Sequence, residues 1–188
     1  MIPCYVSGKG MHATETTWTF KTLVIEVLES TGRGCDTRFR YYRRQFPELS
    51  RAELARRICD PIEYYDRDWP GFRAAHPEWS EVEAVTEFML TRDRIFRDEA
   101  RAAIYCYDEA GFGSGVNSLR LLLAGKPVLG FYDPGGLGGT INLSNVMQLS
   151  VEYPKLFTLL TYRQTEEIGP AVLAWLERLP DPCHANTA

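Results

Sequence analysis

The sequence lacks the features that mark membrane proteins, metalloproteins and disulfide-rich secreted proteins. It has no apolar run long enough to span a bilayer, and its first residues lack the basic and apolar regions of a secretory signal. The three histidines, His12, His76 and His184, share no metal-ligand spacing, and the five cysteines are scattered without a C-x-x-C pair. We therefore expect a cytoplasmic protein with reduced, buried thiols, no membrane contact, no metal and no other cofactor.

The chain also lacks an excess of positive charge and the standard nucleotide-binding loops. Its net charge is −4, which does not favour long nucleic acid as a partner. Neither a phosphate loop ending in Lys-Ser/Thr nor a G-x-G-x-x-G pattern is present. What the chain does have is a length of 188 residues and an apolar fraction of 45%. These values predict one domain, residues 1–188, with a full hydrophobic core.

Apolar runs alternate with helical patterns along much of the chain. The predicted strands are 2–7, 102–107, 127–132 and 156–162, and the predicted helices are 17–30, 80–101, 114–124 and 166–179. Strands that are apolar throughout and alternate with helices are typical of a parallel sheet covered on both faces. The sequence therefore predicts an α/β fold, a single-domain parallel sheet flanked by helices, flavodoxin- or Rossmann-like.

Residues 34–79 do not follow this alternation, and we expect them to form a helical insertion at a sheet edge. Ser50 and Glu53 make a capping-box pattern that begins a short helix. Pro61, Pro70 and Pro77 are expected to break the remainder into short pieces.

In a parallel α/β sheet, ligands bind at the carboxyl ends of the strands. Three predicted loops gather there: 7–10, 108–114 and 133–140. The second contains Gly111-Phe-Gly113-Ser-Gly115, where glycines let a ligand approach the backbone and the next helix offers free N–H groups to an anion. The same pattern also suits a turn that needs glycine only for its geometry.

The segment 102–143 resembles the core of the nucleoside 2-deoxyribosyltransferase family. That family has a G-x-G-x-E-L-G-x-A helix that ends in G-K-x-V and is followed by an Asn-Leu pair. The matching residues here are Gly113, Gly115, Gly125-Lys126 and Asn142-Leu143, with intervals of 12 residues from Gly113 to Gly125 and 17 from Gly125 to Asn142. The 5–8 segment is similar to the family's aromatic strand and the small-residue turn that floors its pocket. Asp93 is similar to its helix-borne aspartate.

The resemblance implies an enzyme acting on the N-glycosidic bond of a nucleoside or nucleotide, a deoxyribosyltransferase or N-glycosidase, working as a homo-oligomer. In the family, a glutamate on the glycine-rich helix attacks the anomeric carbon. Asn117 occupies that position here, so the active site is altered. The alternatives are a non-catalytic nucleotide-binding or sensor module on the same scaffold, and a protein-interaction domain.

Three interpretations of Asn117 stay open. It is a residue of a fold that lost its activity, or it binds a ligand through its amide, which both donates and accepts hydrogen bonds. Otherwise the site hydrolyses by another route, with Asp93, Asp108 or Glu109 as general acid or base toward a water.

The predicted site therefore combines catalytic and ligand-binding residues. The catalytic candidates are Asn117 and Asp93; the ligand-binding candidates are Tyr5, Ser7, Gly8, Asp108, Glu109, Gly113, Ser114, Gly115 and Asn142. Two of these have an ordinary structural alternative, because Asp93 can pair with Arg97 one turn later and Asn142 can cap a helix.

Arginines are concentrated between residues 33 and 57. They are Arg33, Arg38, Arg40, Arg43, Arg44, Arg51, Arg56 and Arg57. Such a cluster is commonly a solvated, salt-bridged face. It is equally suited to attract a phosphorylated ligand, because arginine grips phosphate with two hydrogen bonds. In the second case the ligand is a nucleotide instead of a free nucleoside.

Overall fold

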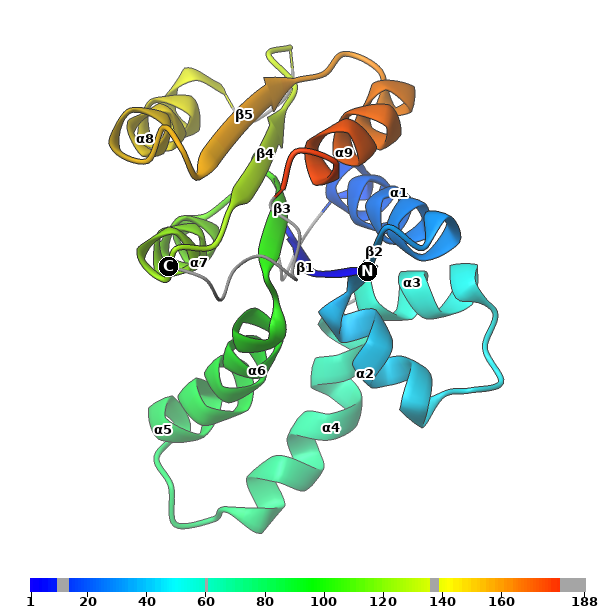
Figure 1. Cartoon of the computed structure of the whole chain (residues 1–188). Coiled ribbons are helices and arrows are strands. Elements are labelled where there is room, and N and C mark those ends of the chain that lie inside the picture. Colours follow the sequence, from blue (N-terminus) through cyan, green and yellow to red (C-terminus); the bar gives the residue numbers. More distant parts are fainter. Residues whose placement is uncertain (10–13, 60, 136–138, 180–188) are drawn as a thin grey trace, which may run out of the picture.

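The chain folds around a parallel sheet with strand order β2-β1-β3-β4-β5 (Figure 1). The computed structural model describes residues 1–9, 14–59, 61–135 and 139–179, apart from the side chains of 61–67, 92 and 139–144. The strands are β1 (Ile2–Ser7), β2 (Gly34–Asp36), β3 (Ala102–Cys106), β4 (Val128–Tyr132) and β5 (Phe157–Thr161). All neighbouring strands run parallel. The predicted α/β fold of flavodoxin or Rossmann type is therefore confirmed.

Helices cover both faces of this sheet (Figure 1). On one side lie α1 (Glu15–Thr31) and α9 (Ile168–Leu176), the latter preceded by the short 3₁₀ turn η2 (Thr165–Glu167). On the other side lie α7 (Phe112–Leu123) and α8 (Gly139–Glu152). This double covering explains why β3 is buried along its whole length and why its sequence, Ala-Ala-Ile-Tyr-Cys, contains no charge.

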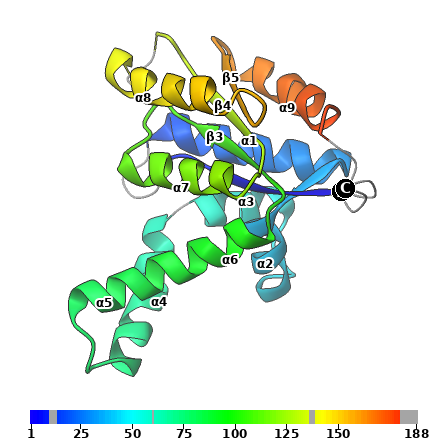
Figure 2. The same cartoon turned by 60° about the vertical axis from the view of Figure 1, so that its left-hand side comes forward.

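The chain between β2 and β3 is helical throughout its regular structure. It comprises α2 (Thr37–Gln45), α3 (Arg51–Cys59), α4 (Pro61–Ala75), α5 (Glu81–Thr86), the π-helical turn η1 (Glu87–Thr91) and α6 (Arg92–Glu99). The helices α4 and α5 extend away from the sheet as an arm (Figure 2). The arm has an aromatic core of its own, in which the Phe72 ring lies 5.0 Å from Phe88 and 4.8 Å from His76.

Three details of the insertion differ from the prediction. The predicted helical insertion of 34–79 begins with a strand, β2, before its helices α2, α3 and α4. Pro70 lies inside α4 without ending it, although proline removes a helical hydrogen bond. The rings of Trp69 and Phe72, on either side of Pro70 in sequence, both pack against Phe88 and stabilise the helix there. The predicted helix 80–101 is divided by η1, which apolar spacing alone does not reveal.

The compositional predictions are tested in part. Cys4, Cys35, Cys59 and Cys106 are buried free thiols, whereas Cys183 lies outside the described residues. Within the described part of the chain, no helix is both long and apolar enough to cross a bilayer. No group of three His, Cys, Asp or Glu side chains among these residues is placed to hold a metal ion.

The strand order creates a crevice between β1 and β3, where a ligand site is expected. From β1 the chain first passes to β2 on one side and later returns to β3 on the other. The loops that follow β1 and β3 therefore leave the sheet in opposite directions, and such a switch point is the usual ligand site of an open parallel sheet.

The tight packing around Gly130 in β4 gives a test of the core. A Cβ at this position would lie 2.4 Å from Cε2 of Tyr107 and 3.1 Å from Cδ1 of Leu159. Gly130→Ala should lower the free energy of unfolding by about 1–3 kcal/mol, because overpacking forces neighbouring side chains to move. Urea denaturation would measure the change.

Gly71→Ala is the matched control, since nothing lies within 4 Å of its added Cβ and Gly71 is exposed in α4. It should be neutral or stabilising by up to about 1 kcal/mol. Equal effects of the two substitutions would contradict this description of the core.

Candidate functional site

Two predicted catalytic residues and one predicted binding residue meet in a single hydrogen-bonded cluster. The Tyr5 hydroxyl donates to Oδ1 of Asp93 at 3.2 Å, and Nδ2 of Asn117 donates to Oδ2 of the same carboxylate at 3.3 Å. Nη1 of Arg97 donates to Oδ1 of Asn117 at 2.6 Å. We call these four residues the Asp93 cluster. It joins β1 to α6 and α7, which lie far from β1 in sequence.

The orientation of the Asn117 amide follows from its neighbours. Its carbonyl oxygen faces the guanidinium of Arg97, which can only donate, and its NH₂ faces the carboxylate of Asp93, which accepts. The opposite orientation would leave both contacts unsatisfied. Arg97 also donates from Nε to the backbone carbonyl of Asp93 at 3.2 Å, so the Arg97 side chain braces Asp93 and Asn117 together.

Burial fixes the proton on Tyr5. Burial raises the pKa of its hydroxyl, and the nearby Asp93 carboxylate raises it further. Tyr5 therefore remains the donor and Asp93 the acceptor. Asp93 is only half-buried, and a carboxylate has about four lone-pair positions, so this residue keeps acceptor capacity beyond Tyr5 and Asn117.

Arg38 is the member of the predicted arginine cluster that reaches this site. Its guanidinium lies 5.6 Å from the centre of the Tyr5 ring and donates from Nη2 to the carbonyl oxygen of Val6. Its Nε lies 3.8 Å from Oδ1 of Asp36, a fully buried carboxylate that accepts from the backbone N–H groups of Val6 and Phe39. The sequence showed the arginine cluster but gave no sign of which arginine lies beside Tyr5.

Ser7, Gly8 and Ser114 join the loop after β1 to the start of α7. Ser114 is buried, and its hydroxyl donates to the carbonyl oxygen of Gly8 at 3.1 Å. On its other contacts Gly8 packs tightly, because a Cβ there would lie 3.0 Å from Cγ2 of Thr17 and 3.3 Å from Cβ of Cys106. Ser7, at the end of β1, is also buried. These predicted binding residues thus shape the crevice. Ser7 and Ser114 are also close in sequence to Tyr5 and Asn117 of the Asp93 cluster.

The glycines of the 111–115 motif face open space. Gly113 and Gly115 lie in the first turn of α7, are exposed, and have nothing within 4 Å of an added Cβ. Close packing within the chain therefore does not require glycine at either position. Free space above the start of α7 is what a ligand approaching the backbone would need.

Asp108 and Glu109 are held inside the protein. Oδ1 of Asp108 accepts from the backbone N–H of Asp133 at 2.6 Å, and its Oδ2 accepts from the Tyr162 hydroxyl. Glu109 accepts from the hydroxyl of Thr17 at 2.5 Å and from the backbone N–H of Thr14 at 3.0 Å. Both carboxylates tie loops to the sheet, so Asp93 is the candidate acid or base with the most acceptor capacity left.

Asn142 lies within α8, which begins at Gly139, so it does not cap that helix. Its side chain lies outside the described part of the chain, and the prediction that it binds a ligand stays a prediction.

Lys21 is a buried cation that the sequence did not single out. It lies on the apolar face of α1, is 3% exposed, and donates from Nζ to the carbonyl oxygen of Lys9 at 2.7 Å. Burial, followed by the nearby charge of Arg38, lowers its pKa from 10.5 to about 8. Lys21 thereby fixes the loop after β1 beneath the crevice.

Asp108→Asn tests the structural role of the Asp108 carboxylate. The substitution keeps the shape but turns one acceptor into a donor that faces another donor, so the free energy of unfolding should fall by about 2 kcal/mol or more. Asp133→Asn is the control, because Oδ1 of Asp133 accepts from the backbone N–H of Gly135 in an exposed turn. Equal urea midpoints for the two variants would show that Asp108 is not a structural anchor.

Lys21→Met tests the buried cation through pH. Because the pKa of Lys21 is lower in the folded chain, the unfolded chain binds more protons between pH 8 and 10.5. The cost of burying the charge is thus fully present below pH 8 and is lost as the pH rises toward 10.5. Between pH 7 and 10.5 the wild type should gain roughly 3 kcal/mol of unfolding free energy relative to the variant.

Urea denaturation at several pH values would measure this difference, with Lys155→Met as the exposed control. A constant difference between wild type and Lys21→Met across this range would contradict the assignment.

Comparison with known proteins adds no assignment to this geometry. No protein-family model matches the chain, and no curated protein matches it. A parallel α/β sheet hosts many unrelated activities, so the fold alone does not identify a function. The function must therefore be argued from the Asp93 cluster and from the residues that carry the resemblance to nucleoside 2-deoxyribosyltransferases.

Proposed function

We propose that this chain binds a nucleoside or nucleotide beside the Asp93 cluster and acts on its N-glycosidic bond. The observation that carries the proposal is the meeting of Tyr5, Asp93 and Asn117, three residues chosen from sequence, in one hydrogen-bonded group. The cluster lies at the switch point of the sheet, where ligands of such folds bind.

The proposed chemistry is hydrolysis with a water as nucleophile. Asn117 carries no charge and cannot form the covalent sugar ester that a glutamate would form. Asp93 accepts a proton from a water, the water oxygen bonds to the anomeric carbon, and the base leaves with the electrons of the N-glycosidic bond and takes up a proton. The amide of Asn117 and the hydroxyl of Tyr5 hold the Asp93 carboxylate in place.

The second candidate is a nucleotide-binding module without catalysis. It is favoured by the uncharged amide of Asn117, which keeps one N–H donor and one lone pair of its carbonyl oxygen beyond its bonds to Asp93 and Arg97. Under either candidate, Arg38 helps to position Tyr5, because its guanidinium lies beside the Tyr5 ring while Asp36 offsets its charge.

We also propose a homo-oligomer located in the cytoplasm. The oligomer follows from the resemblance, and the cytoplasmic location is supported by the four buried free thiols, which a reducing compartment preserves.

Base release is the experiment that tests the proposal. The purified chain is incubated with ribonucleosides, deoxyribonucleosides, their 5′-monophosphates and NAD, and free base is measured by chromatography. We expect release by the wild type and a loss of at least about 100-fold in Asp93→Asn, as for removal of a general base. Glu99→Gln, an exposed carboxylate on the same helix, is the control and should retain full activity.

Asn117→Glu separates the two candidates. If the wild type binds a nucleoside by calorimetry but releases no base, and Asn117→Glu releases base, the chain is a binding module with an intact pocket. Absence of both binding and release across the whole panel would overturn both candidates.

A further inference from the structure

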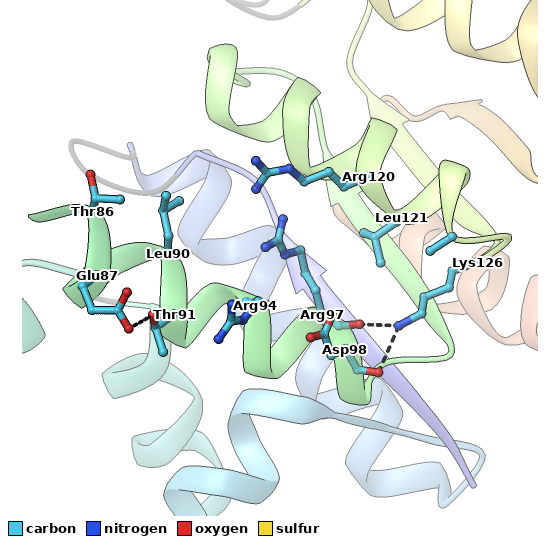
Figure 3. A pocket seen from close by; sticks show the side chains of 11 residues that line it. Thr86, Glu87, Leu90, Thr91, Arg94, Arg97, Asp98, Arg120, Leu121 and Lys126 are labelled. Carbon is cyan, nitrogen blue, oxygen red and sulfur yellow. Dashed lines mark hydrogen bonds between the residues drawn. The ribbon is translucent and has the colours of Figure 1, made fainter. Parts of the chain in front are cut away.

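Arg97, which donates to Asn117, also lines a concave site. It is a groove of about 480 Å³ between η1 and α6 on one wall and the end of α7 on the other. The residues that matter to the argument are Leu90, Arg94, Arg97, Arg120, Leu121 and Lys126 (Figure 3). We call it the basic groove. Asp93 and Asn117 are not among its lining residues, so it is distinct from the Asp93 cluster.

The basic groove carries more positive than negative charge. Four cations line it, Arg94, Arg97, Arg120 and Lys126, against the two carboxylates of Glu87 and Asp98. Figure 3 shows the three guanidinium groups in the middle of the groove, with Glu87 toward one end and Lys126 toward the other.

Two of these cations have spare hydrogen-bonding capacity. Arg94 and Arg120 are exposed, and within the described part of the chain neither has an ion-pair partner. Lys126 is engaged differently, because its Nζ donates to the backbone carbonyls of Arg97 and Asp98 at 2.6 and 3.0 Å. Lys126 therefore caps the end of α6, while Arg94 and Arg120 remain available to a ligand.

Gathering like charges in one groove is unfavourable unless an anion offsets them. Arg94 and Arg97 are three residues apart on α6 and share one side of the helix, so their charges repel. A phosphate group would accept paired hydrogen bonds from such guanidiniums and relieve the repulsion. The apolar side chains of Leu90 and Leu121 in the same wall offer contact to an uncharged part of a ligand.

We propose that the basic groove binds a small oligophosphate, either free or as the polyphosphate of a nucleotide. Its volume is within the range of small-molecule sites, roughly 300–1,000 Å³, and a net charge of −4 for the whole chain disfavours a long nucleic acid as the occupant. Arg97 contributes to both sites, since it lines the groove and donates to Asn117. Oligophosphate in the groove therefore contacts the residue that braces the Asp93 cluster.

Isothermal titration calorimetry with inorganic tripolyphosphate and with a nucleoside triphosphate tests this site. We expect both to bind at low salt and to weaken as salt rises. The double variant Arg94→Gln/Arg120→Gln should lose at least about tenfold in affinity, a typical effect of removing charge-assisted hydrogen bonds. Tighter binding of the nucleoside triphosphate than of tripolyphosphate identifies a nucleotide as the ligand, and equal binding identifies the phosphate chain alone.

The matched control is Arg163→Gln/Arg178→Gln, which removes the same charge from exposed positions near β5 and α9. It should change the affinity less than twofold. No binding of either compound to the wild type, or equal losses in the two double variants, would overturn the proposal. Thermal melts of both double variants would verify that they are folded.

The outcome does not depend on the proposed function. Tripolyphosphate has no N-glycosidic bond, and Asp93→Asn, which should lower base release at least about 100-fold, should not weaken tripolyphosphate binding, because it removes a negative charge close to the groove. Failure of either proposal can therefore be recognised without reference to the other.

Discussion

The Asp93 carboxylate is the interaction on which the arrangement of the site depends. Through this side chain β1 is hydrogen-bonded to both α6 and α7, by way of Tyr5 and Asn117. A charged group in a half-buried position is stable only with hydrogen-bonding partners, so the three elements must approach one another closely. Since α6 follows directly from the arm, the same contact fixes the base of the arm against the sheet.

The general fold was predictable because strands that are buried on both faces consist almost entirely of apolar residues, a pattern that is easily seen in the sequence. Strands such as β3 and β4 have few choices other than apolar residues, and the helices between them show their apolar faces. The edge strand β2 was not predicted, because three residues, Gly34–Asp36, are too short for any periodicity to appear. The π turn η1 was missed for a related reason, since its extra residue changes the register of a helix without changing its composition.

Site residues were predictable only where they matched a position of the family that this chain resembles. Asp93 and Asn117 were identified from their place in the resemblance, and the structure brings them together. Arg38 and Lys21 were not identified from the sequence. Their roles depend on which groups the ends of these long side chains contact, and the sequence does not show those contacts. The environment of Asp108 shows the reverse case, since an acid in a predicted ligand loop is used to hold two other loops.

The uncharged side chain at position 117 has a consequence for the basic groove. The two acceptors of Arg97, the amide oxygen of Asn117 and the backbone carbonyl of Asp93, are both neutral. A glutamate at this position would instead pair with the guanidinium and reduce the positive potential around it. With asparagine, Arg97 holds the cluster in place while its charge remains effective in the basic groove. An asparagine at position 117, which disfavours covalent chemistry at one site, thus favours anion binding at the neighbouring site.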